Sequence, residues 1–211
     1  MRVSRVKAAE NRERIVDTAA RLFREKGFEG VGIDAIMKEA GLTHGGFYGH
    51  FGSKEDLVAE AVVRALTRSA EELARFTDLG DLAGAYLSEH HLADRVTGCA
   101  VAAWSSDLCR QNEGVRRGLT AHLRAKIDHF AALVREGGKA ERRRRAIATL
   151  AGLLGALTLA RAVEEPDLAK EILAAARAEF GKKRPAARRK SQATATRRSR
   201  AAPNSARAAT P

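Results

Sequence analysis

Cysteine, aromatic residues and long apolar runs are scarce in this 211-residue chain. Its two cysteines, Cys99 and Cys109, have neither the paired spacing of a zinc site nor the density of a disulfide scaffold. The longest apolar run, residues 146–160, is shorter than the roughly 20 residues that a membrane-spanning helix needs. The N-terminus lacks the apolar core of a signal peptide. We therefore expect a cytoplasmic protein that has no metal site and no membrane association.

Sequence patterns of catalytic sites are missing as well. The chain contains no Gly-x-Ser-x-Gly, P-loop or dinucleotide-binding pattern. His90 and His91, with Asp94 and Cys99, do not have the spacing of zinc ligands. We predict no enzymatic activity, no catalytic residues and no cofactor.

Acidic residues are absent from one segment, residues 181–211, which holds ten lysines and arginines. Of the chain's 38 basic residues this leaves 28, nearly balanced by the 26 acids, so the net charge of +12 belongs mainly to this tail. The tail has no Leu, Ile, Val or Phe to form a core, and we expect it to be disordered. Its charge predicts either a salt-sensitive attraction to polyanions or only a solubilising role.

The rest of the chain has helical patterning. Ala and Leu dominate and strand-type alternation is absent, which predicts an all-α fold. In residues 11–26, for example, Ile15, Ala19 and Leu22 share one helical face. Further helices are predicted at residues 33–40, 43–51, 54–76, 79–92, 99–111, 113–136, 140–163 and 167–179, separated in several places by glycine or proline.

The segment LTHGGFYGHFGSKEDL, residues 42–57, places three glycines in a predicted short helix, although each costs about 1 kcal/mol relative to alanine. Gly41 suits the tight turn before this helix, and Thr43 is expected to cap it. Ser53 and Asp56 are expected to form a capping box for the next helix. The order helix, glycine turn, short helix predicts a helix-turn-helix unit, in which missing Cβ atoms let the backbone approach the major groove of DNA. The alternative is a compact three-helix unit without a ligand.

Residues 12–57 resemble the N-terminal domain of the TetR/AcrR family of bacterial transcriptional regulators. The resemblance rests on IVDTAARLFREKGFEG, IDAIMKEAGLTHGGFYGHF and SKEDL, in the family's order. It implies contacts with DNA phosphates for four residues and a place at the base edges for two. Independently of the resemblance, Phe47 and Phe51 are expected to be core anchors that seat the short helix on its neighbours. The predicted DNA-binding residues are Thr43, Tyr48, His50 and Lys54 at phosphates, His44 and Gly45 at bases, and Gly46 beside them.

Two departures from the family pattern affect this prediction. Gly32 stands where many members have a capping Ser or Thr, and Gly46 stands where many have a side chain. With few side chains able to reach bases, we expect part of the operator sequence to be read through DNA shape.

Residues 54–180 are predicted to form a helical ligand-binding and dimerisation domain, which follows a DNA-binding domain at 1–53 and precedes the tail at 181–211. The resemblance implies a homodimer on a roughly palindromic double-stranded DNA operator, and a repressor that a small, apolar or aromatic effector releases. The predicted dimer interface comprises Leu150, Leu153, Leu154, Leu157, Leu168 and Ile172. The alternative is that the helices which hold these residues only complete the core of the monomer. The predicted effector pocket comprises Tyr86, His90, Cys99, Ala103, Trp104 and Phe130.

Two alternatives remain open at this stage. Cys99 at a helix N-terminus is either a reactive thiol that senses electrophiles or oxidants, or a small buried residue that fills space. The chain as a whole is either an effector-controlled regulator or a general, nucleoid-type DNA-binding protein that uses its tail and has no effector.

Overall fold

The predicted all-α fold is confirmed in the computed structural model, which describes residues 4–181 apart from the side chain of Ser105; this range contains helices and no strand. The predicted tail lies outside the described residues, except for Gly181. The elements are α1 (Arg5–Lys26), α2 (Ile33–Glu39), the 3₁₀-helix η1 (His44–Gly49), α3 (Lys54–Ala74), α4 (Leu79–Tyr86), α5 (Glu89–Ala93), α6 (Ala100–Leu108), α7 (Glu113–Leu133), α8 (Lys139–Ala162) and α9 (Pro166–Phe180).

Three elements differ clearly from the prediction. Helix α1 begins at Arg5, six residues before the predicted start, where the Ser4 side chain caps it by accepting from the Lys7 amide. The short helix expected at 43–51 is a 3₁₀-helix, held by bonds such as that from the His50 amide to the Phe47 carbonyl, at 2.8 Å. Three glycines in six residues weaken α-helix formation there. The helix expected at 79–92 is divided into α4 and α5, because the Ser88 hydroxyl accepts from the His91 amide and starts a new helix.

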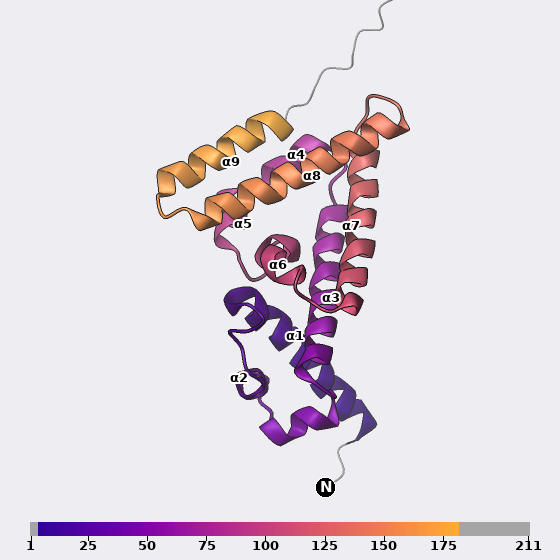
Figure 1. Cartoon of the computed structure of the whole chain (residues 1–211), viewed down its shortest axis with the longest axis vertical. Coiled ribbons are helices and arrows are strands. Elements are labelled where there is room, and N and C mark those ends of the chain that lie inside the picture. Colours follow the sequence, from indigo (N-terminus) through magenta and orange to yellow (C-terminus); the bar gives the residue numbers. More distant parts are fainter. Residues whose placement is uncertain (1–3, 182–211) are drawn as a thin grey trace, which may run out of the picture.

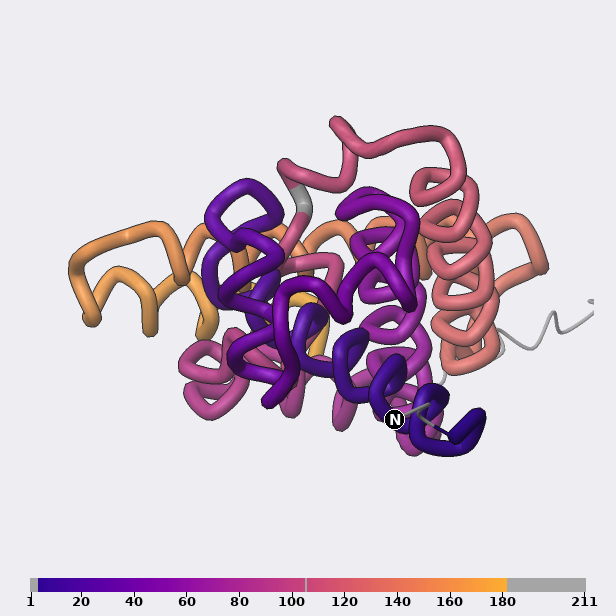
Figure 2. The backbone as a smooth tube through the Cα atoms, turned by 90° about the horizontal axis from the view of Figure 1, so that it is seen from below, coloured from indigo at the N-terminus to yellow at the C-terminus, as the bar shows by residue number. Residues whose placement is uncertain are grey.

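The N-terminal helices form a small unit of their own at one end of the molecule (Figure 1). Gly41, at φ 70°, makes the turn between α2 and η1 in the left-handed conformation that glycine tolerates. Phe47 is fully buried and Phe51 is 4% exposed, so the prediction that both anchor η1 in the core is confirmed. Figure 2 looks at this end and shows the N-terminal helices across the front of the molecule.

Helix α3 joins this unit to the rest of the chain. Ser53 caps it by accepting from the Asp56 amide at 3.1 Å, as predicted. Ion pairs tie α3 to α1, among them Arg64 to Asp17 at 2.7 Å. Because α3 packs against both α1 and α7, the predicted domain boundary after residue 53 stays a prediction.

The larger part of the molecule is a helical body. Helices α3 and α7 run side by side, and α8 and α9 pack together at the end far from α1 and α2 (Figure 1). Helix α6 lies between these groups and contacts α1, α3, α7 and α8. It thereby connects the N-terminal unit with the helical body.

By length and composition alone α8 could cross a membrane, a test that a core helix of a soluble protein also passes. Its apolar window is 39% buried within the subunit. Part of that apolar surface therefore has no covering helix in the single chain.

Candidate functional site

The surface of η1 combines a buried anchor with exposed polar groups. Phe47 packs beneath it on Phe51, with ring centroids 5.6 Å apart. Tyr48, the next residue, is 63% exposed and meets the Phe47 ring edge-on. The aromatic core thus fixes the helix while it directs a phenol outward.

The glycines of η1 have no intramolecular reason to be glycine. A Cβ atom at Gly45 or Gly49 would meet nothing within 4 Å, and neither residue has a positive φ. A Cβ atom at Gly46 would make ordinary contacts, at 3.6 Å from Thr43 Oγ1 and 3.7 Å from Met37 Cε. Neither the backbone conformation nor packing within the subunit requires glycine at positions 45 and 49. The missing side chains leave the backbone of η1 open to an external partner.

The polar residues predicted beside these glycines lie on the same surface, with two differences. Thr43 stands at the N-cap position, but its side chain makes no capping hydrogen bond, so its predicted capping role is wrong. Its hydroxyl is consequently free of that role. His44 Nδ1 contacts the carboxylate of Asp34 in the first turn of α2, so a base contact by His44 would have to compete with that carboxylate.

His50 and Lys54 are partly exposed and flank the other end of η1. Lys54 is the first residue of α3, whose N-terminal amide groups favour anions. Together with Tyr48 they give this end of the molecule donors for phosphate oxygens.

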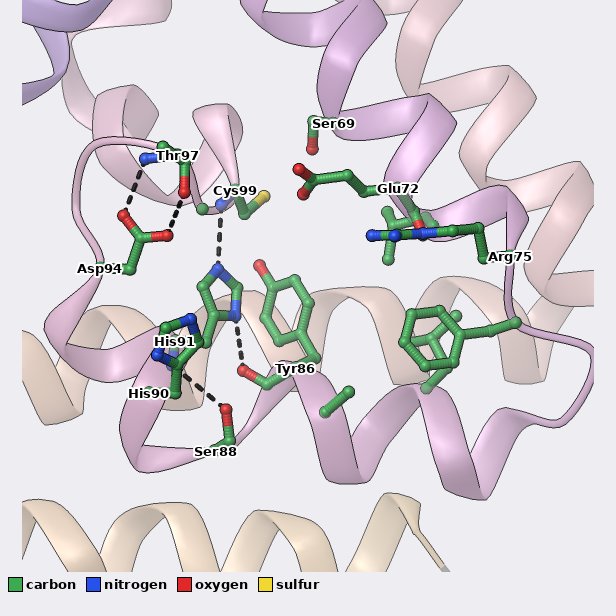
Figure 3. Close-up of a pocket in the computed structure, with 15 residues that line it drawn as sticks. Ser69, Glu72, Arg75, Tyr86, Ser88, His90, His91, Asp94, Thr97 and Cys99 are labelled. Atoms are coloured by element: carbon green, nitrogen blue, oxygen red, sulfur yellow. Dashed lines mark hydrogen bonds between the residues drawn. The ribbon is translucent and has the colours of Figure 1, made fainter.

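A pocket of about 280 Å³ lies in the helical body, between α3, α4, α5 and the loop before α6 (Figure 3). Of the predicted pocket residues, Tyr86, His90 and Cys99 line it, whereas Ala103, Trp104 and Phe130 do not. Sequence reasoning missed the α3 face of the pocket, because helical spacing alone does not tell which side of a long helix faces a cavity. That face contributes Ser69, Glu72 and Leu73 of α3, and the segment after α3 contributes Arg75 and Phe76.

Cys99 is the N-cap residue of α6 and is 4% exposed. Its Sγ lies 3.7 Å from Nζ of Lys126, a lysine of α7 that is itself 5% exposed. Burial alone raises the pKa of the Cys99 thiol, but the Lys126 ammonium and backbone amides of α6 outweigh it and lower that pKa.

Tyr86 points from α4 toward Cys99 (Figure 3). Its hydroxyl is buried and has no partner with hydrogen-bond geometry among residues 4–181. Burial, and then the charge of a Cys99 thiolate, raise the pKa of Tyr86 well above its ordinary value, so the phenol keeps its proton.

His91 of α5 holds in place the loop before α6, residues 94–99 (the pocket loop). Its Nδ1 must donate to the Tyr86 carbonyl, at 2.7 Å, which leaves Nε2 to accept from the Cys99 amide, at 2.9 Å. Only the neutral ring can make both bonds. Burial lowers the pKa of His91, consistent with this neutral form.

Two buried side chains connect the loop before α6 with α1. Arg24 of α1 donates to the carbonyls of Val96 and Gly98, and to that of Ala65 in α3. Trp104 of α6 donates from Nε1 to the Phe23 carbonyl at 2.9 Å. Trp104 was predicted to line the pocket; it instead packs in the core between α6 and the end of α1.

The other end of the pocket loop is bound to α8. Arg161 donates to the carbonyls of His91 at 2.7 Å and Asp94 at 2.8 Å. The loop is therefore held from two sides, by α1 through Arg24 and by α8 through Arg161.

The predicted interface residues divide into two groups. Leu150, Leu153 and Leu157 are at most 5% exposed and pack within the subunit, because they face the other helices of the same chain. Leu154, Leu168 and Ile172 keep exposed surface. Beside them α8 exposes a row of mainly small residues, Ala151, Gly155 and Leu159.

Comparison with known proteins agrees with this architecture. Residues 15–61 match the family described as bacterial regulatory proteins, tetR family. The chain is 40% identical over 75 residues to the uncharacterized HTH-type transcriptional regulator YerO of Bacillus subtilis, and 41% identical over 59 residues to AcrR of Shigella flexneri. These matches cover 36% and 28% of this chain, but only 25% and 27% of the relatives.

The structural likeness extends further along the chain. A TetR transcriptional regulator from Chloroflexus aurantiacus superimposes with a TM-score of 0.67 at 25% identity. The match covers 82% of this chain and 95% of that protein.

Proposed function

Because this chain belongs to the TetR/AcrR family of bacterial regulators, we propose that it is a sequence-specific DNA-binding transcriptional regulator. The observation that carries the proposal is the outer surface of η1. Gly45 and Gly49 leave its backbone open, and the exposed Tyr48 stands between them. A surface that is open at the backbone and edged by hydrogen-bond donors fits a DNA groove between its phosphates.

The proposed DNA-contact residues follow from this surface. Four side chains would donate hydrogen bonds to phosphates: those of Tyr48, His50, Lys54 and Thr43. The Thr43 hydroxyl is available because it makes no capping hydrogen bond. The backbone around Gly45 would lie nearest the bases. Few side chains then read bases directly, so sequence-dependent DNA shape supplies part of the specificity.

We propose that the active species is a homodimer. The apolar row on α8, together with Leu168 and Ile172 of α9, is the surface that lacks a cover in the single chain. Small residues in this row permit close approach of the same helices from a second copy, as in a four-helix bundle. Two copies present two η1 surfaces, which suits a roughly palindromic operator.

The proposed regulation is repression that a small molecule relieves from the pocket at Tyr86 and Cys99. A ligand there would press on the loop that Arg24 holds to α1 and Arg161 holds to α8. Displacing this loop changes how α1 sits against the dimer helices, and hence the spacing of the two η1 surfaces. The ligand acts only in so far as it binds the two conformers with different affinity.

A gel-shift titration against the chain's own upstream intergenic DNA, at physiological salt with unrelated competitor DNA, tests the proposal. We expect a discrete complex that survives the competitor and that Gly45→Ala or Tyr48→Phe weakens. A diffuse shift that the competitor abolishes would instead favour the general, nucleoid-type DNA-binding protein.

A further inference from the structure

Beside the pocket, the sulfur atom of Cys99 lies against the amino group of a buried lysine of α7. Among residues 4–181, the hydrogen-bond partner of Lys126 Nζ is Cys99 Sγ, at 3.7 Å. Both side chains are at least 95% buried. An isolated buried ammonium is costly unless an opposite charge accompanies it. A thiolate on Cys99 supplies that charge, so the geometry favours the thiolate–ammonium pair.

A second group points to a ligand at the same place. The Tyr86 hydroxyl lines the pocket, is buried and has no hydrogen-bond partner in the described part of the chain. A buried hydroxyl without a partner is unfavourable, and a ligand with an acceptor oxygen would satisfy it. Figure 3 shows this hydroxyl directed toward Cys99. Nucleophile and donor therefore face the same small space.

We propose that Cys99 is the covalent attachment site for soft electrophiles of the α,β-unsaturated carbonyl class that enter this pocket. The pocket, of about 280 Å³, accommodates a molecule of this class with few carbon atoms. The carbonyl oxygen would occupy the free position at Tyr86, and the β-carbon would face the sulfur. This assignment names the ligand class of the proposed pocket.

The addition balances without an oxidant or a leaving group. The Cys99 thiolate forms a C–S bond to the β-carbon, and the electron pair of the C=C bond moves to the carbonyl oxygen as an enolate. The enolate takes a proton from the Tyr86 hydroxyl, which regains one from water at the pocket mouth. Lys126 stabilises the thiolate before attack and is unchanged afterwards.

Other charged and titratable groups lie near Cys99 and also influence the charge state of its thiol. Arg24 of α1 and Arg161 of α8 both interact with the Cys99 charge, and His91 of α5 binds the Cys99 amide. Glu72 of α3 lines the same pocket. The two arginines favour a thiolate, as Lys126 does, so the titration of Cys99 belongs to this whole cluster.

The chain carries its own control, because Cys109 is exposed while Cys99 is buried. Full-length, reduced protein would be treated at pH 7 with less than one equivalent of methyl vinyl ketone, and the adducts mapped by peptide mass spectrometry. We expect Cys99 to react before Cys109. Reaction at Cys109 alone, with Cys99 modified only in denaturant, would overturn the proposal and make Cys99 an inert core residue.

Variants then separate chemistry from structure. In a Cys109→Ser background, the labelling rate of Cys99 would be measured from pH 5 to 9. Lys126→Met should slow the rate at pH 7 by roughly tenfold, the effect of one pKa unit, and move the midpoint to higher pH. Tyr86→Phe keeps the packing and should slow the rate without moving that midpoint downward. Lys139→Met, which removes an exposed lysine, should change neither.

If circular dichroism shows that Lys126→Met does not fold, the labelling rate of Tyr86→Phe alone tests the proposal. An unchanged rate in a folded variant contradicts its assigned role, and unchanged rates in both overturn the proposal. Labelling needs no DNA, so it is independent of the proposed function. Release of DNA by the adduct rests on that function and is measured separately, by gel shift of the labelled protein.

Discussion

Substitution of a single residue on η1 should weaken DNA binding without lowering the stability of the protein. Gly45→Ala places a methyl group where the protein has nothing within 4 Å. The free energy of unfolding should therefore stay unchanged or rise by up to about 1 kcal/mol, because alanine is the better helix former. Operator affinity should fall by about tenfold or more, equivalent to about 1.4 kcal/mol, because the methyl group holds the backbone away from the groove. Thermal unfolding and gel-shift titration measure the two quantities.

Gly84→Ala provides the matched control. Gly84 lies in α4, and a Cβ atom there also meets nothing within 4 Å. It should gain the same stability without any change in operator affinity. Equal affinity losses in the two variants would mean that the effect of Gly45→Ala does not come from contact with DNA.

Two histidines make stability depend on pH. Burial lowers the pKa of His122 to about 4 and also lowers that of His91. The unfolded chain binds protons at histidine near pH 6.5, before the folded chain does, so acid favours unfolding. Stability should be full above pH 6.5 and should fall as the pH drops toward 4. Urea unfolding at several pH values measures this, and His122→Gln should make the midpoint less sensitive to pH. A pH-independent midpoint between 7.5 and 5 would contradict it.

Elements were predictable from sequence where a single pattern controls them. The amphipathic spacing of Ile15, Ala19 and Leu22 gave α1, and Ser53 gave the start of α3. The division between α4 and α5 was missed, because the hydroxyl of Ser88 outweighs an otherwise continuous helical pattern. The 3₁₀ form of η1 was missed. A high glycine content indicates that an α-helix is weak, but it does not indicate which conformation the segment adopts instead.

The pocket was only partly predictable for a related reason. Tyr86 and Cys99 were predicted because small residues beside a tryptophan on one side of a helix can line a cavity, and Tyr86 was expected to face the same interior. Lys126 was not found, because a lysine in a helix rich in charged residues normally faces solvent. Its burial against Cys99 is decided by how α7 packs on α6, a long-range contact that no local pattern encodes.

The contact between α1 and the loop before α6 gives a prediction at the scale of elements. Arg24→Met keeps the apolar stem but releases the carbonyls of Val96, Gly98 and Ala65. The free energy of unfolding should fall by about 2–3 kcal/mol, and amide exchange around residues 96–99 should accelerate. Urea unfolding and hydrogen exchange by mass spectrometry measure the two effects.

Arg68→Met is the control for that experiment. Arg68 is an exposed arginine that pairs with Asp17 at 3.0 Å, and its loss should cost less than about 1 kcal/mol. If both variants lost the same stability and left exchange of the loop unchanged, Arg24 would not be the link between the two parts of the molecule.

At the scale of the whole molecule, one chain leaves apolar surface on α8 and α9 at the end far from η1 (Figure 1). Leu159 is 58% exposed there, so Leu159→Glu should leave the subunit folded. In a dimer the same change would bury a carboxylate without a partner, which is strongly unfavourable. Sedimentation should therefore show a monomer at micromolar concentration, with an unchanged circular dichroism spectrum.

Operator binding should weaken with the dimer, because a monomer reaches only one half-site. The expected loss is about a hundredfold or more at equal concentration, since the second half-site then binds as a separate event. Val63→Glu changes a valine on α3 that is 55% exposed and should affect neither sedimentation nor affinity. A Leu159→Glu protein that still sedimented as a dimer would place the subunit interface on another surface. An unchanged affinity in a proven monomer would show that one η1 surface suffices, and the palindromic operator would no longer follow from the fold.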